Sequence, residues 1–142
     1  MATIPIGLEL YSVRHGLEND VRGTLKAVAD MGYAGVEFAG PPRNEATYLR
    51  ELLDEFGLVC CGWHCPYNLV QDDQLEATVE RNKILGNKFV IVPGIPGELR
   101  QTRDDWLKIA AFFNELAEKL APHGLVTGYH NHHIEFAELD GE

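Results

Sequence analysis

Apolar residues along the chain follow two patterns that alternate from one end to the other. Short apolar runs predict five strands, and longer stretches with apolar residues three and four positions apart predict four amphipathic helices. The strands are expected at residues 4–12, 35–39, 58–64, 88–93 and from 125 onward, and the helices at about 20–32, 45–56, 73–85 and 102–121. The fourth strand is the most apolar, so it is expected to be covered on both faces. The fifth is expected to begin as a buried strand.

This succession of strand, polar loop and helix predicts an α/β fold with a parallel sheet and right-handed crossovers. A doubly wound sheet and a (β/α) barrel both satisfy that pattern. Polar residues end four of the strands: Glu9 and Tyr11, Glu37, His64, then His130 and His132. Glycines precede them on the same face and are expected to leave room for a ligand: Gly7, Gly35, Gly62 and Gly128.

Two features favour the barrel. In a barrel the carboxyl ends of the strands meet at one mouth, where active sites lie. A dinucleotide-binding sheet, in contrast, would carry a glycine-rich phosphate fingerprint after its first strand, and residues 12–16 (SVRHG) do not form one. We therefore predict a parallel (β/α) TIM-barrel type of fold, truncated to about five strands, as one domain over residues 1–142.

Composition and charge restrict the class of partner. The net charge is −10, from 22 acidic and 12 basic residues, which disfavours nucleic acid and anionic membranes. No apolar run approaches the roughly 20 residues of a membrane helix. Three clustered cysteines, Cys60, Cys61 and Cys65, are expected to be reduced thiols rather than a disulfide framework. With no recognisable signal peptide, a cytoplasmic protein is expected.

The carboxyl end of the fifth predicted strand and the residues that follow it hold three histidines, an asparagine and a glutamate within six positions. His130 and His132 would share one face of an extended strand, roughly 6–7 Å apart, with Glu135 a few residues on. Such a set suits metal binding or proton transfer; the alternative is a polar strand end that meets water. Glu37 and His64 carry the same two alternatives, and Glu9 and Tyr11 either line the mouth or simply meet solvent.

Four segments together resemble the xylose isomerase-like TIM-barrel superfamily, and more narrowly its sugar phosphate isomerase/epimerase group. They are GLELYSVR at 7–14, MGYAGVEFAG at 31–40, GWHCPY at 62–67 and GYHNHHIEF at 128–136. The resemblance implies a small-molecule sugar substrate and proton transfer at a sugar carbonyl or enediolate at the barrel mouth. It also implies a divalent metal there, manganese, zinc or magnesium.

By the same resemblance, Glu37, His64 and His132 match catalytic positions. His130 stands where many relatives have a metal-binding glutamate, so the site loses one negative charge. His130 and Glu135 are the metal ligands expected from this chain, Glu135 either replacing the missing carboxylate or capping the following turn.

Length sets the last expectation. A complete barrel has eight strands and about 250 residues, whereas this sequence has 142 residues and five predicted strands. In the family the remaining metal ligands come from the later strands, so this chain alone is expected to have an incomplete, inactive site. We expect either a part of a longer or split isomerase that lacks its C-terminal half, or a homodimer that closes the open edges. The alternative function is a non-catalytic, oligomerising half-barrel that serves as a binding module. A DNA-repair endonuclease of the same superfamily is disfavoured by the charge.

Overall fold

A computed structural model describes residues 4–138; residues 1–3 and 139–142, at the ends of the predicted domain, lie outside the described residues. Five strands form one sheet: β1 (Gly7–Glu9), β2 (Gly35–Ala39), β3 (Val59–His64), β4 (Phe89–Val92) and β5 (Val126–Tyr129). The α-helices are α1 (Arg14–Asn19), α2 (Val21–Asp30), α3 (Ala46–Phe56), α4 (Asp72–Leu85) and α5 (Arg103–Leu120). Short 3₁₀ helices are η1 (Leu10–Val13), η2 (Tyr67–Val70), η3 (Gly97–Leu99), η4 (Ala121–His123) and η5 (Ile134–Phe136). None of the described helices is long and apolar enough to cross a membrane.

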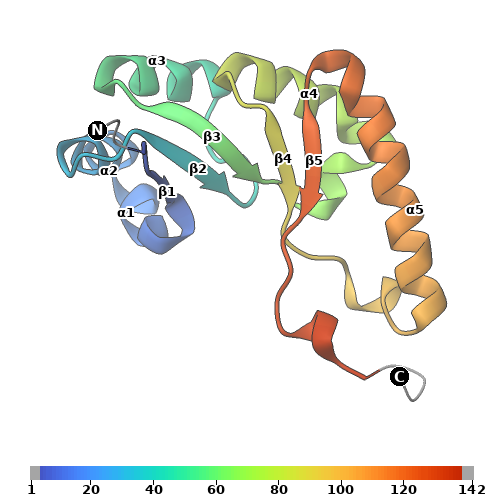
Figure 1. Cartoon of the computed structure of the whole chain (residues 1–142). Helices are drawn as coiled ribbons and strands as arrows, with labels where there is room; N and C mark the ends of the chain where they lie inside the picture. The colour runs from blue at the N-terminus through green and yellow to red at the C-terminus, as the bar shows by residue number, and fades with distance from the viewer. Residues whose placement is uncertain (1–3, 139–142) are drawn as a thin grey trace.

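The strand order identifies the architecture. The strands lie in the order β1-β2-β3-β4-β5, and every neighbouring pair is parallel. Right-handed crossovers that always move in the same direction place successive helices on one face of the sheet, whereas a doubly wound sheet reverses direction. Figure 1 shows α3, α4 and α5 following one another along the same side of the sheet. The predicted fold class, a partial TIM barrel, is confirmed.

The first strand is shorter than predicted. It ends at Glu9 rather than at residue 12, because the Glu9 carboxylate accepts a hydrogen bond from the backbone N–H of Tyr11 (3.1 Å). This bond caps η1, which turns the chain into the unpredicted α1 and then α2. The other boundaries agree with the prediction to within a few residues, and the Thr102–Asp105 capping box that begins α5 is present.

The hydrophobic core lies between the sheet and the helices, in two clusters. One joins β1, β2 and the start of β3 to α2 and α3, and includes Leu25, Val36 and Leu53. The other joins β3, β4 and β5 to α4 and α5. Trp63 belongs to the second cluster, and its indole N–H donates to the Gly40 carbonyl oxygen (2.9 Å).

The opposite face of the sheet is open. Val59 is 58% exposed, Phe89 47% and Val126 54%, although all three are strand residues. The expectation that β4 is covered on both faces is therefore wrong, as is the expectation that β5 begins buried. The helices shield only the outer face, so every second strand residue in this part of the sheet meets solvent.

A β-bulge interrupts the pairing of β2 with β3. Val36 pairs with Cys60 and Glu37 pairs with Gly62, so Cys61 is an extra residue in β3. Cys60 is buried on the helix side, whereas Cys61 is exposed. Because the bulge adds one residue, the side chains after it alternate in the opposite phase, and His64 faces the open side while Trp63 packs in the core.

Candidate active site

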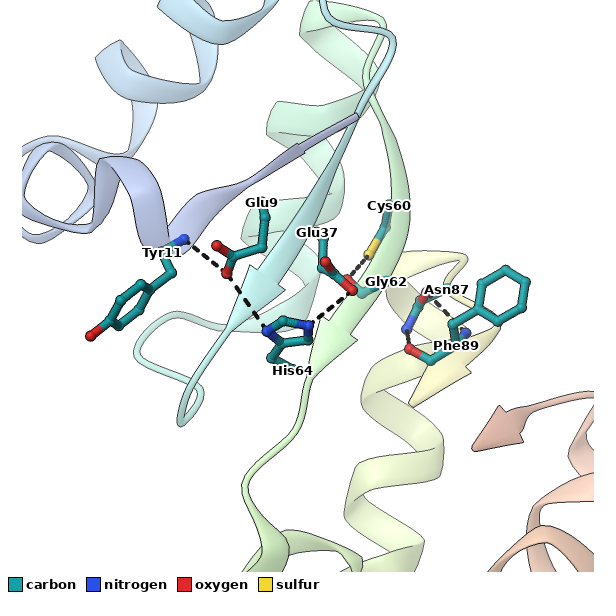
Figure 2. A network of polar contacts seen from close by, with 8 residues as sticks. All are labelled: Glu9, Tyr11, Glu37, Cys60, Gly62, His64, Asn87 and Phe89. Atoms are coloured by element: carbon teal, nitrogen blue, oxygen red, sulfur yellow. Dashed lines mark hydrogen bonds and ion pairs between the residues drawn. The ribbon is translucent and has the colours of Figure 1, made fainter. Parts of the chain in front are cut away.

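Three strand ends bring one histidine between two carboxylates. Glu9 ends β1, Glu37 lies on β2 in register with it, and His64 ends β3. His64 Nδ1 lies 3.7 Å from Glu9 Oε1, and Nε2 lies 3.5 Å from Glu37 Oε1. Figure 2 shows the imidazole pointing one nitrogen toward each carboxylate. With only 14% of its side chain exposed, His64 has a restricted orientation at the carboxyl edge of the sheet.

Two local features hold the carboxylates in place. Glu9 Oε1 also accepts the backbone N–H of Tyr11, which fixes its rotamer. Glu37 needs the absence of a side chain at Gly62, because a Cβ atom there would overlap the Glu37 carboxylate. The glycines were expected to leave room for a ligand, but the structure fills part of that room with neighbouring side chains. A Cβ at Gly7 would lie 2.7 Å from Cys61 Sγ.

His130 and His132 extend this cluster. The rings of His64 and His130 are 4.6 Å apart and meet edge to face, and the rings of His130 and His132 are 4.8 Å apart. The strand that was expected to hold both histidines ends at Tyr129, so they lie in the following loop rather than alternating on β5. His130 N–H still donates to the Val92 carbonyl oxygen (3.0 Å), and this bond keeps the start of the loop against β4.

Glu135 binds to the loop itself. One carboxylate oxygen accepts a hydrogen bond from the Tyr129 hydroxyl, and the other accepts the backbone N–H of His132 (2.6 Å). Burial opposes ionisation of Glu135, but these hydrogen bonds outweigh it and lower its pKa below the ordinary value. Burial and the same bond raise the pKa of Tyr129. Both Glu135 oxygens thus stabilise the turn, as in the capping alternative considered from the sequence.

The described residues do not by themselves form a metal centre. Within residues 4–138, no group of three or more His, Cys, Asp or Glu side chains is arranged to hold a metal ion. His64 faces its carboxylates through its nitrogens, and Glu135 is engaged by Tyr129 and the loop backbone. The donors present do not fit the divalent metal that the family resemblance implies. The assignment of His130 and Glu135 as metal ligands stays a prediction.

The cysteines differ according to the face they occupy. All three are free thiols. Burial raises the pKa of Cys60 and of Cys65 to about 12, so neither forms a thiolate near neutral pH. Cys61 is exposed on the open side, and partial burial together with the nearby Glu37 carboxylate raises its pKa as well. No disulfide joins any two of these three cysteines.

Comparison with known proteins identifies the family of this chain. A family model described as xylose isomerase-like TIM barrel matches residues 25–140. The chain belongs to this family. No curated protein matches it.

Several solved structures share the fold. A sugar phosphate isomerase/epimerase from Parabacteroides distasonis superposes with a TM-score of 0.77 at 24% identity, over 100% of this chain and 57% of the other. A family 2 AP endonuclease from Brucella melitensis gives 0.67 at 18% identity, over 89% and 55%. A probable 3-DHS dehydratase from Bacillus anthracis gives 0.64 at 14%, over 87% and 51%. This chain thus spans about half the length of these proteins.

Sequence reasoning left open whether Glu9 lines the mouth or meets solvent, and it did not place Glu9 among the catalytic or metal-binding residues. The signal was present, since Gly7 and Glu9 alternate as Gly35 and Glu37 do, and a parallel register places the two glutamates side by side. What the sequence could not give is that the strand stops at Glu9 and that His64 reaches it from two strands away.

Proposed function

We propose that this chain forms the first part of a barrel that isomerises or epimerises a small sugar by moving a proton beside its carbonyl group. The observation that carries the proposal is His64, which has both ring nitrogens facing carboxylates at the edge where (β/α) barrels hold their active sites. The fold shared with a sugar phosphate isomerase/epimerase supports it. Family membership alone does not specify a reaction.

The residues divide the proton transfers among them. Glu37 removes the proton from the carbon next to the carbonyl, and His64 gives a proton to the carbonyl oxygen, which yields an enediol. Addition of a proton to the former carbonyl carbon, with loss of the proton from the hydroxyl of the other carbon, gives the isomer. Addition of a proton to the opposite face of the original carbon, with return of the proton on the former carbonyl oxygen to His64, gives the epimer. Glu9 orients the imidazole ring of His64 through Nδ1. His132, which is exposed and lies beside His130 with the two rings tilted by 51°, exchanges protons with solvent.

The rest of the barrel is needed to enclose the substrate. The chain supplies Glu9, Glu37 and His64 from one side of a mouth, and it covers 57% of the length of the Parabacteroides protein. The open face leaves the mouth in contact with water on the side of the missing strands. We therefore expect little turnover from residues 1–142 alone and full activity when the remaining strands are present.

A chimera tests the proposal. This chain replaces the matching 57% of the Parabacteroides protein, and incorporation of deuterium from D₂O into a panel of aldoses and ketoses is followed by ¹H NMR. We expect exchange at the carbon next to the carbonyl. His64→Asn and Glu37→Gln should each lower its rate by about a hundredfold or more, because each removes a general acid or base.

Glu55→Gln is the matched control. Glu55 pairs with Arg22 on the outer helices, so this variant should keep the exchange rate. A folded chimera that exchanges no sugar, while the unmodified Parabacteroides protein exchanges the same panel, would contradict the proposal. An unchanged rate in His64→Asn would contradict the role of the histidine.

A second candidate is a half-barrel that associates with its own copy. The exposed Val59, Phe89 and Val126 favour it, since together they give the open face an apolar surface that a partner would cover. Sedimentation equilibrium over a concentration series would then give a dimer of the 15.9 kDa chain, and Phe89→Glu would shift it to monomer. A wild-type monomer at all concentrations would count against this candidate.

A further inference from the structure

A cavity of about 220 Å³ lies beside the carboxyl ends of β1 and β2. Its walls come from η1, α1, the end of β2 and the loop that follows, with Trp63 of β3 and Arg81 of α4. Glu37 and His64 do not line it. Phe38, on its wall, packs against both core clusters and therefore lies on the helix side of the sheet. The cavity is thus separate from the candidate sugar site.

The cavity is positively charged although the chain is acidic. Three guanidinium groups line it, those of Arg14, Arg43 and Arg81, against a single carboxylate, that of Glu18. Glu18 is occupied by Arg43, whose Nη1 lies 2.7 Å from Glu18 Oε1. This arrangement concentrates positive potential in a molecule whose net charge is −10.

The other two arginines bond to backbone carbonyl groups. Arg14 Nη1 donates to the Tyr11 oxygen (2.8 Å), and Arg81 Nη1 donates to the Asn44 oxygen (3.0 Å). Within residues 4–138, neither makes an ion pair with a carboxylate. Arg81 is half-buried, and desolvation lowers its pKa. The nearby Glu45 carboxylate offsets this lowering only in part, and a half-buried cation that no carboxylate contacts is costly, so an anion in this cavity would be stabilised.

Aromatic rings form the remaining walls. Tyr11, Phe38 and Trp63 line the cavity, and the Arg14 and Arg81 guanidinium groups lie over the Tyr11 and Trp63 rings, at 4.3 and 5.4 Å from the ring centroids. Flat apolar walls suit a planar body, and the arginine fork suits a carboxylate or phosphate group. The volume is below the roughly 300–1,000 Å³ of pockets that take drug-sized molecules, so the ligand must be small.

From these walls we propose that the cavity binds a small organic anion with a planar apolar body, such as an aromatic carboxylate or an aryl phosphate. Arg14 and Arg81 bind the anionic group, and the rings of Tyr11, Phe38 and Trp63 contact the body. This site is additional to the proposed sugar site, because the residues of that site do not line it.

Trp63 gives a direct readout. Its indole N–H donates to the Gly40 carbonyl oxygen, and both residues line the cavity. The chain has two tryptophans, and the second, Trp106, packs against Tyr129 outside the cavity, so its indole signal is an internal control. ¹H–¹⁵N NMR spectra of the ¹⁵N-labelled chain are recorded during titrations with benzoate and with phenyl phosphate. Benzyl alcohol, acetate and inorganic phosphate separate the contribution of the ring from that of the charge.

We expect a saturable shift of the Trp63 signal with benzoate or phenyl phosphate, at least about tenfold tighter than with any of the three partial probes, because a charged hydrogen bond adds that much. Arg14 is exposed, so Arg14→Ala should fold normally, as checked by circular dichroism, and should weaken binding by about tenfold or more. Lys119→Ala removes the same charge from α5, where Lys119 pairs with Asp72, and should leave the affinity unchanged.

Three outcomes would overturn the proposal. The first is the absence of a saturable Trp63 shift with both aromatic anions. The second is binding of benzyl alcohol as tight as that of benzoate, which would remove the anion assignment. The third is an equal loss of affinity in Arg14→Ala and Lys119→Ala, which would reduce the effect to net charge.

Discussion

Val90 and Phe89 are neighbours on β4, yet Val90 is fully buried and Phe89 is 47% exposed. The same contrast separates Cys60 from Cys61 on β3. The outer face of the sheet, covered by the helices, holds both core clusters, whereas the open face carries Glu9, Glu37 and His64 beside unpartnered apolar residues. Alternate residues of one strand thus serve different purposes: one set stabilises the fold, and the other is available for chemistry and contact.

The largest expected effect is on cysteine reactivity. Iodoacetamide should alkylate Cys61 at least about a hundredfold faster than Cys60 or Cys65, because burial raises the pKa of both to about 12 and reaction requires the thiolate. Peptide mass spectrometry over a time course measures the three rates. In denaturant the rates should become equal, and equal rates in the native protein would remove the distinction between the faces.

Matched valine substitutions come next. Val90→Ala should lower the free energy of unfolding by about 2 kcal/mol, from lost burial and the cavity left behind. Val59→Ala makes the same chemical change on the open face and should cost less than about 0.5 kcal/mol. Urea denaturation compares the two. A large loss in Val59→Ala would mean that the open face is covered in solution, as in the dimer.

The loop after β5 should contribute less. Tyr129→Phe removes the hydroxyl that donates to Glu135 and should lower stability by at most about 1 kcal/mol, since the pair is partly exposed. The pKa of Glu135 is lowered in the folded state, so its ionised form stabilises the fold above the ordinary pKa. This contribution is lost as pH falls through the lowered value.

The destabilisation by Tyr129→Phe should therefore be largest near neutral pH and shrink in acid. Thermal unfolding of the variant and wild type between neutral and acidic pH measures this difference. Tyr48→Phe, at an exposed position on α3, is the control and should show no such pH dependence. A constant difference between Tyr129→Phe and wild type at all pH values would show that Glu135 does not depend on the hydroxyl.

The smallest effect on stability is expected at Gly62. Gly62→Ala would displace the flexible end of Glu37 and should cost only a few tenths of a kcal/mol on the open face. It should nevertheless move Glu37 away from His64 and change the imidazole ¹H–¹⁵N signals of His64. Gly128→Ala is the control, because its Cβ would lie 3.2 Å from Ile91 Cδ1 and not against the carboxylates. Unchanged His64 signals in Gly62→Ala would place Glu37 elsewhere in solution.

The sequence predicts most of the fold because local signals agree with the final packing. Gly57 and Gly86 end α3 and α4 with positive φ (both 69°), where glycine is favoured, and the apolar stripe of α5 faces the core. Glu37 and His64 were likewise predicted at strand ends, and the structure places them 3.5 Å apart. Periodicity and parallel topology suffice for the helix ends and for the order of the strands, whereas the side that His64 faces also depends on the bulge at Cys61.

The remaining features depend on contacts that no local pattern encodes. The end of β1 at Glu9 follows from the bond of its side chain to Tyr11 N–H. The departure of His130 and His132 from an extended strand accompanies the bonds of Glu135 to Tyr129 and to the loop backbone. The cavity near Arg14 and Arg81 forms from segments far apart in the sequence, so the sequence alone does not show that these arginines line one cavity.

The extra residue at Cys61 has a consequence for how β3 can vary. If side chains alternated strictly from Val59 onward, Trp63 would face the open side of the sheet and His64 would face the helices. The bulge reverses the alternation midway along β3. Before the bulge, Cys60 packs in the first core cluster; after it, Trp63 packs in the second cluster and His64 faces the carboxylates. Deleting Cys61 would remove the bulge and leave Trp63 in the core and His64 at the mouth, whereas regular pairing with Cys61 retained would put one half of β3 out of phase and move either the indole out of the core or the imidazole away from its carboxylates. A single inserted residue thus lets one strand place Trp63 in the hydrophobic core and His64 beside the carboxylates.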